Sequence, residues 1–219
     1  MLRFFSSCLL VALPWVAWAQ KTDADTTDYL PTGIRIGTDL ISLGKSFAGD
    51  KFDGWEVNAD IDFRRYYLTA DYGNWARNVS IENGSYTNNG TYVRIGADVN
   101  FLLKDPDRNM FFLGMRYGRA SFNEQVVYQV RDTIFGDAGY ALENADLRAR
   151  WAELTLGLRV KIWKHLWMGY TARMKFFPKV NNQTEITTYD IPGYGLAAKR
   201  TYYGFNYQIF WKIPFRKDD

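Results

Sequence analysis

Residues 152–162 read AELTLGLRVKI, and residues 203–215 read YGFNYQIFWKIPF. In the first stretch, the leucines at positions 154, 156 and 158 alternate with Thr155, Gly157 and Arg159. The second stretch alternates aromatic and aliphatic residues with glycine, asparagine, glutamine and lysine in the same way. A period of two is the period of a β-strand that has one apolar and one polar face.

The same alternation marks six further segments, at residues 34–40, 55–63, 66–73, 93–103, 111–118 and 166–176. Tight turns are expected at 64–65, 104–109 and 163–165, and long polar loops at 44–54, 74–91, 123–148 and 177–200. Short turns at one end and long loops at the other are typical of outer-membrane barrels. The sequence therefore predicts an all-β chain, an eight-stranded antiparallel up-and-down transmembrane β-barrel. No substantial helix is expected, although residues 142–154 could include a helical turn.

Composition excludes several classes of protein. The 219 residues carry a net charge of +3, too close to neutral for a nucleic-acid-binding protein. Cys8 and His165 are the sole cysteine and histidine, so a disulfide framework and the usual zinc sites are excluded. We expect no cofactor.

The N-terminal residues have the pattern of an export signal. Arg3 precedes a short apolar run, and Ala17-Trp18-Ala19 fits a cleavage site. The predicted organisation is a signal peptide at 1–19, a polar lead-in at 20–32, the barrel at 33–215 and a tail at 216–219.

The polar face of the strands is predicted to line the barrel interior. That face carries a glycine in nearly every segment, which makes room for long side chains inside a narrow eight-stranded barrel. It also carries both signs of charge, and buried charges must be paired because an unpaired buried ion costs several kcal/mol. The predicted interior charge network comprises Arg35, Asp39, Glu56, Asp60, Asp62, Asp71, Arg94, Asp98, Arg116, Glu153, Arg159, Lys161, Arg173 and Lys175.

Aromatic residues gather near the ends of the predicted strands, and they make up 17% of the chain. Two aromatic belts flanking an apolar band are typical of proteins that cross a bilayer. The predicted interfacial aromatics are Trp55, Tyr66, Tyr117, Trp151, Trp163, Trp211 and Phe215. The alternative is a soluble periplasmic barrel of the lipocalin kind, with its apolar face inside.

With these features, residues 30–215 resemble the small eight-stranded outer-membrane barrels of Gram-negative bacteria, the OmpA/OmpX-like architecture. Residues 203–215 are similar to the C-terminal strand that barrel-assembly machinery recognises, although Arg216 to Asp219 follow it. The chain also resembles uncharacterised barrel families of similar length. The resemblance implies insertion into outer-membrane lipid by that machinery; it implies no activity.

Candidate chemistry is sparse. His165 lies in a predicted turn between Trp163 and Trp167, where anchoring at an interface is expected rather than catalysis. The carboxylates of Asp39, Glu56 and Asp60 share the predicted interior, where an ion network is the expected role. Tyr194, within the turn-rich segment 191–195, is a candidate contact site for a partner or ligand.

The predicted function is non-enzymatic: an integral outer-membrane protein that acts structurally or through its long loops. One alternative is an accessory component of an envelope secretion or assembly complex, docking an envelope protein. Another is a lipid-modifying barrel enzyme.

Overall fold

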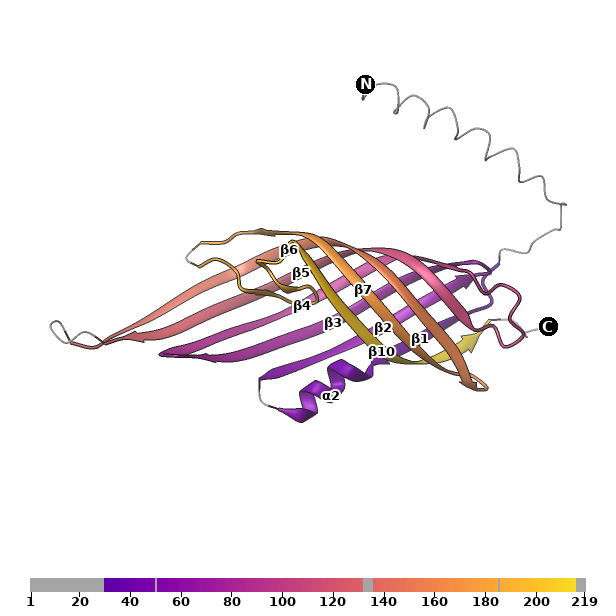
Figure 1. Ribbon diagram of the computed structural model, residues 1–219, viewed down its shortest axis with the longest axis horizontal. Coiled ribbons are helices and arrows are strands. Elements are labelled where there is room, and N and C mark those ends of the chain that lie inside the picture. The colour runs from indigo at the N-terminus through magenta and orange to yellow at the C-terminus, as the bar shows by residue number, and fades with distance from the viewer. Residues whose placement is uncertain (1–29, 50, 132–135, 185, 216–219) are drawn as a thin grey trace, which may run out of the picture.

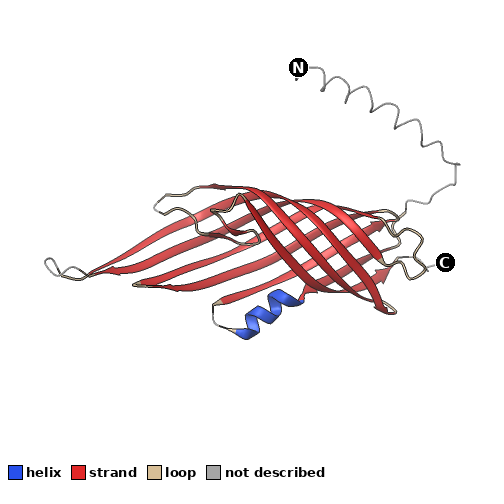
Figure 2. Ribbon diagram, viewed as in Figure 1, coloured by secondary structure: helices blue, strands red, loops and turns tan. Residues whose placement is uncertain are grey.

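The computed structural model describes residues 30–49, 51–131, 136–184 and 186–215. Within these ranges, eight long antiparallel strands pair in a ring, which makes a closed barrel (Figures 1 and 2). The order around the ring is β1-β10-β7-β6-β5-β4-β3-β2. The strands are β1 (Gly33–Asp39), β2 (Phe52–Phe63), β3 (Tyr66–Ile81), β4 (Gly84–Asn100), β5 (Met110–Val130), β6 (Ala138–Trp163), β7 (Leu166–Asn181) and β10 (Thr201–Pro214). The antiparallel all-β prediction is confirmed.

The ring closes because β1 pairs with both β2 and β10. Gly33 lies opposite Pro214, and Arg35 lies opposite Lys212 on one side and Asp60 on the other. Both described ends of the chain therefore lie at the end of the barrel that carries the short turns (Figure 1). We call this the turn end, and the opposite one the loop end.

Two of the predicted long loops are strands. β3 runs on to Ile81 and β4 starts at Gly84, while β5 and β6 extend to Val130 and from Ala138. The region in which a helical turn was considered also lies within β6. The prediction of loops at 74–91 and 123–148 was wrong because polar residues, glycines and apolar residues follow one another there without a regular alternation, which hides a period of two.

These four strands project beyond the barrel at the loop end (Figure 1). The pairing of β2 with β3 begins at Phe52 opposite Arg77, and the pairing of β6 with β7 stops at Arg148 opposite Asn181. Beyond those points, within the described ranges, β3, β4, β5 and β6 pair only with one another, and we call this four-stranded projection the extension.

A helix, α2 (Leu40–Ala48), follows β1 where the sequence predicted the end of a strand and a loop. Asp39 caps it: the Asp39 carboxylate accepts hydrogen bonds from the Ser42 amide at 3.1 Å and the Ser42 hydroxyl at 2.6 Å. The expectation of no substantial helix was therefore wrong. α2 lies outside the strand wall, against β2 and β10 (Figure 1).

The barrel has charged side chains on its inner face and large apolar side chains on its outer face, which is the reverse of the distribution in a water-soluble protein. Met115, Ile95 and Leu158 are 70%, 57% and 48% exposed on the outside, whereas the buried side chains of the same strands include acidic and basic ones. Arg116, Arg94 and Arg159, each next to one of those apolar residues in the chain, are at most 4% exposed.

Candidate functional site

The barrel interior contains a chain of paired charges, which we call the ion ladder. It comprises five guanidinium groups and five carboxylates, each at most 5% exposed. Its members are Arg35, Arg94, Arg116, Arg159 and Arg173 with Glu56, Asp60, Asp71, Asp98 and Glu153. They converge because each occupies an inward position on its strand, and their formal charges cancel.

The ladder is continuous from the turn end upward. Arg35 and Arg159 share the Asp60 carboxylate, with an Arg35 Nε to Asp60 Oδ1 distance of 2.8 Å. Arg116 then bridges Asp98 at 2.9 Å and Asp71 at 2.8 Å. Asp71 thereby connects the lower half of the ladder to the upper half.

The upper half is built on Arg94 and Arg173. Arg94 pairs with Glu56 and lies 3.2 Å from Asp71. Arg173 lies 3.2 Å from Asp71 and 3.0 Å from Glu153, and its Nε donates to Asn206 Oδ1 at 2.5 Å. Each charge therefore faces a charge of opposite sign, which offsets the cost of burial.

Aromatic rings and glycines complete the packing around these ions. The Arg159 guanidinium lies 5.0 Å from the Phe112 ring centroid and 4.6 Å from that of Phe210. A Cβ on Gly114 would stand 1.9 Å from Asp98 Oδ1. Because that space is already taken, the strand can pass so close to the carboxylate only with glycine at this position.

The loop end of the barrel is closed by an inward-folded hairpin, formed by β8 (Asp190–Ile191) and β9 (Gly195–Leu196). We call residues 190–196 the plug. Ile191 and Tyr194 are fully buried against Tyr92, Phe122 and Trp151, among others. Lys175 Nζ holds the plug by donating to the carbonyl oxygens of Gly193 at 2.7 Å and Tyr194 at 3.0 Å.

The plug corrects the prediction for Tyr194. Its side chain is 0% exposed, and its ring packs edge-on against Trp151 with centroids 5.9 Å apart. Tyr194 is therefore a packing residue and not a surface contact. The clustered aromatic and turn residues of 191–195 indicate a compact hairpin as well as they indicate a contact site. The sequence does not show whether that hairpin folds into the loop end of the barrel or away from it.

A second buried polar cluster lies between the extension and the plug, and sequence reasoning missed it. Glu124 accepts from the Tyr86 hydroxyl at 3.0 Å and from Asn144 Nδ2 at 2.9 Å. Asp190, also buried, lies 3.3 Å from Arg77, yet burial outweighs that cation and raises the pKa of Asp190. Continuing the alternation of β5 beyond residue 118 would have placed Glu124 on the inner face.

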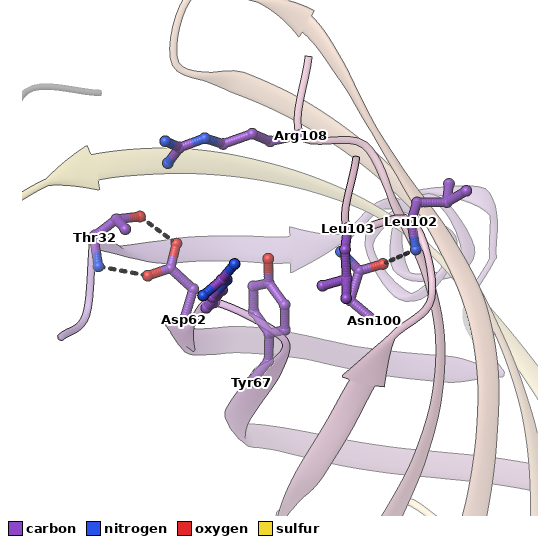
Figure 3. A pocket seen from close by; sticks show the side chains of 8 residues that line it. Thr32, Asp62, Tyr67, Asn100, Leu102, Leu103 and Arg108 are labelled. Carbon is purple, nitrogen blue, oxygen red and sulfur yellow. Dashed lines mark hydrogen bonds between the residues drawn. The ribbon is translucent and has the colours of Figure 1, made fainter. Parts of the chain in front are cut away.

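At the turn end a cavity of about 300 Å³ lies below the ladder (Figure 3). Asp62 accepts from the Thr32 amide at 2.6 Å and from its hydroxyl at 2.5 Å. Leu102 and Leu103, from the turn between β4 and β5, lie across the cavity from that pair (Figure 3). This arrangement fastens the incoming chain to the barrel.

Comparison with known proteins gives a family without an assigned activity. Residues 1–218 match the family model described as Domain of unknown function (DUF6048). The chain belongs to this family. A search of curated proteins finds no match.

Four predicted site residues of this DUF6048 protein lie elsewhere than expected. Trp151 is 2% exposed and donates from its ring nitrogen to Glu153 Oε1 at 2.6 Å, so its interfacial assignment was wrong. Lys161 is exposed beyond the last ladder residue of β6, and so lies outside the network. Asp62 is only half-buried and binds Thr32, whereas Asp39 is buried but bonds to α2.

Lys175 is buried as predicted, but its hydrogen bonds go to the plug. The remaining predicted network residues form the ladder. The other six predicted interfacial aromatics are exposed on the outer face: Trp55, Tyr66, Tyr117, Trp163, Trp211 and Phe215.

The three interior carboxylates weighed for catalysis each have a structural partner. Glu56 binds Arg94, Asp60 binds Arg35, and Asp39 caps α2. His165 lies in the exposed turn before β7, with its ring centroid 5.9 Å from that of Trp211. Among the described residues, no three His, Cys, Asp or Glu side chains are grouped to hold a metal. No helix in the same ranges is long and apolar enough to cross a bilayer.

The predicted signal peptide at 1–19, the lead-in up to residue 29 and the tail at 216–219 lie outside the described residues.

Proposed function

We propose that this protein is an integral outer-membrane barrel with a non-conducting interior, and that it acts structurally or by binding at its loop end. One observation carries the proposal: paired charges occupy the middle of the inside, while large apolar side chains cover the outside. In water this arrangement would expose a wide apolar surface, which marks a membrane or protein contact. In a bilayer the same surface is stabilised by contact with lipid.

The dimensions of the outer apolar surface support insertion. A transmembrane β-strand needs about 9–11 residues. Along β6, the outward residues from Ala152 to Ile162 are all apolar, and Trp163 ends the run at the turn end. Tyr66, Trp211 and Phe215 are further exposed aromatics at that end, and Trp55 and Tyr117 lie towards the other.

The predicted signal peptide supports export, and membrane-inserted barrels of this kind belong to the outer membrane. In the proposed orientation the turn end faces the periplasm and the extension faces outward. Insertion would rely on barrel-assembly machinery acting on the strand at residues 203–215.

The ion ladder and the plug support a closed interior. In an eight-stranded barrel, the interior is just wide enough for side chains to fill it. Here the ladder occupies the middle and the plug the loop end. A soluble lipocalin-like binder would instead need an apolar interior with room for its ligand.

An accessory role in an envelope assembly complex is the second candidate, and the extension favours it. Near its tip the rings of Tyr128 and Tyr140 stack with centroids 5.3 Å apart. Val127, Val130 and Tyr140 are between 41% and 48% exposed there. Exposed aromatic and β-branched side chains on a projecting hairpin suit contact with another protein.

Heat-shift electrophoresis of outer-membrane fractions tests the proposal. A closed membrane barrel should resist SDS when unheated and change its mobility on boiling, and the purified protein in planar bilayers should give no ion-conductance steps. A protein in the soluble periplasmic fraction, with no mobility change on boiling, would overturn membrane insertion. Steady conductance steps would overturn the closed interior.

A further inference from the structure

The strand wall of the barrel is interrupted on one side. β1 ends at Asp39, which lies opposite Gln208 of β10. Within the described residues, the preceding part of β10, residues 201–207, therefore pairs only with β7. On the other side of the gap, the only described strand that pairs with residues 52–56 of β2 is β3.

Helix α2 closes this gap against β2. The Thr38 hydroxyl donates to the Glu56 carbonyl at 2.8 Å. Ser46 of α2 accepts from the Gly54 amide at 2.7 Å and donates to its carbonyl at 2.8 Å. These side chains provide hydrogen bonds that a neighbouring strand would otherwise make.

α2 also lies close to β10, but no hydrogen bonds of the described helix residues close the gap on this side. Asp39 accepts from the Tyr207 amide at 3.0 Å, and among the described residues no hydrogen bond joins α2 to β10. Because N–H directions alternate along a strand, the amides of Phe205 and Tyr203 point to the same side as that of Tyr207. We call the opening between α2 and β10 the lateral cleft.

The lateral cleft is a cavity of about 260 Å³ that reaches the ion ladder. Its inner wall carries the cations Arg94, Arg173 and Lys175, and Lys45 of α2 adds a further cation. The carboxylates of Asp39 and Glu56 also line it, but Asp39 is committed to capping and Glu56 to Arg94. Arg94 and Arg173 are likewise paired with ladder carboxylates, which leaves Lys175 and Lys45 as the lining cations that bind no carboxylate among the described residues.

Lys175 distinguishes this cleft from the rest of the interior. Its side chain is buried, yet its hydrogen-bond partners among the described residues are two backbone carbonyls rather than a carboxylate. An ammonium group has three donors, so one remains for a ligand. Gly204 adjoins this group: a Cβ there would stand 3.4 Å from Lys175 Nζ.

The outer part of the cleft is apolar. Ile41, Phe52, Tyr203 and Phe205 line it, and Tyr203 and Phe205 are 70% and 60% exposed. On α2, Phe47 is 89% exposed, so apolar surface also continues along the helix. The cleft thus joins a basic inner end to an apolar outer surface.

We propose that the lateral cleft binds an anionic amphiphile: an acyl chain with a carboxylate or phosphate head. The head binds Lys175 next to Gly204, and the chain passes between Ile41 and Phe205 to the outer face. This inference rests on the proposed membrane insertion, since the chain then continues into the bilayer. The cavity takes the head and the start of the chain only.

The test is native mass spectrometry of the exported chain, released from neutral maltoside micelles with added dodecanoate, dodecyl phosphate or uncharged dodecanol. Three variants accompany the natural protein. Gly204→Leu fills the cleft and keeps every charge, whereas Lys45→Met removes a cation from exposed α2. Lys161→Met is the matched control, because that lysine is exposed outside the cleft. Each sample is also run on the heat-shift gel.

We expect one bound molecule of dodecanoate or dodecyl phosphate and none of dodecanol. Affinity should fall at least about tenfold in Gly204→Leu, fall less in Lys45→Met and stay unchanged in Lys161→Met. Tighter dodecanoate identifies a fatty-acid head, and tighter dodecyl phosphate identifies a phospholipid-like head. Equal binding of dodecanol, or equal binding by all variants, overturns the inference.

The gel separates this failure from that of the proposed function. Natural protein that shifts on boiling but binds neither anion overturns the lateral site alone. Protein that is soluble and gives no heat shift overturns membrane insertion as well.

Discussion

Replacing Asp71 by asparagine removes the carboxylate that joins the two halves of the ion ladder. Asp71 Oδ2 lies 2.8 Å from Arg116 and 3.2 Å from both Arg94 and Arg173, while Oδ1 accepts from Asn58 at 2.8 Å. An amide has an acceptor on one side only. In either orientation its NH₂ group faces another donor, and the guanidinium groups lose a buried countercharge.

Removing one partner of a buried ion pair costs about 3–5 kcal/mol. With a urea dependence of about 2 kcal/mol per M, the unfolding midpoint of Asp71→Asn should fall by roughly 2 M. The assay is urea unfolding of the barrel in neutral micelles, followed by loss of the unheated gel form. Asp53→Asn is the control, because Asp53 is exposed on β2 and should change stability by less than about 0.5 kcal/mol. Equal midpoints for the two variants would refute the reasoning that the ladder is a tightly coupled interior.

Three further changes test other parts of the structure. A Cβ on Gly118 would stand 2.2 Å from the Trp151 ring, so Gly118→Val should lower the free energy of unfolding in urea by about 1–3 kcal/mol. The same change at Gly139, which has open space, should cost less, and equal costs would contradict this packing. Asp39→Ala removes the cap of α2, so hydrogen exchange should quicken there by a factor corresponding to about 1 kcal/mol. Among the strand amides only that of Tyr207, which also bonds to Asp39, should change with it; unchanged exchange in α2 would show that the cap is not needed. Burial raises the pKa of Asp190, so ionised Asp190 destabilises the fold as pH rises above 3.8 towards its folded pKa. The melting temperature of Asp190→Asn, relative to that of the natural protein, should therefore rise between pH 4 and pH 8. A difference in melting temperature that stays constant over this range would exclude the linkage.

The barrel strands were predictable where one face is apolar. Along β6, the alternation of Leu154, Leu156 and Leu158 with Thr155, Gly157 and Arg159 fixes the period, and it also separates the two faces. The ladder residues could be identified because each lies on the polar face of such a strand. Trp151 is two residues from Glu153 and therefore lies on the same, inner face. It was wrongly assigned to the membrane interface because its aromatic side chain was given more weight than its position in the alternation.

Other features were not predictable from local pattern. The segments at 74–91 and 123–148 are strands because they pair with each other in the extension, although their own side chains favour loops. α2 begins where Asp39 can cap it, and the same carboxylate bonds to Tyr207, 168 residues further along the chain. A local reading of residues 34–40 shows only the alternation that would continue the strand.

The sequence by itself determined the number of barrel strands, the places of the short turns between them, and which face carries the charges, because a period of two is a local property of the chain. Only the tertiary structure decided which charges pair, that Tyr194 folds inward, and that the wall stays open between α2 and β10. Pairing depends on strand register and on the closure of the ring, which bring Arg173 to Asp71 across 102 residues. The plug and the cleft depend on how much space the closed ring leaves, which no single segment contains.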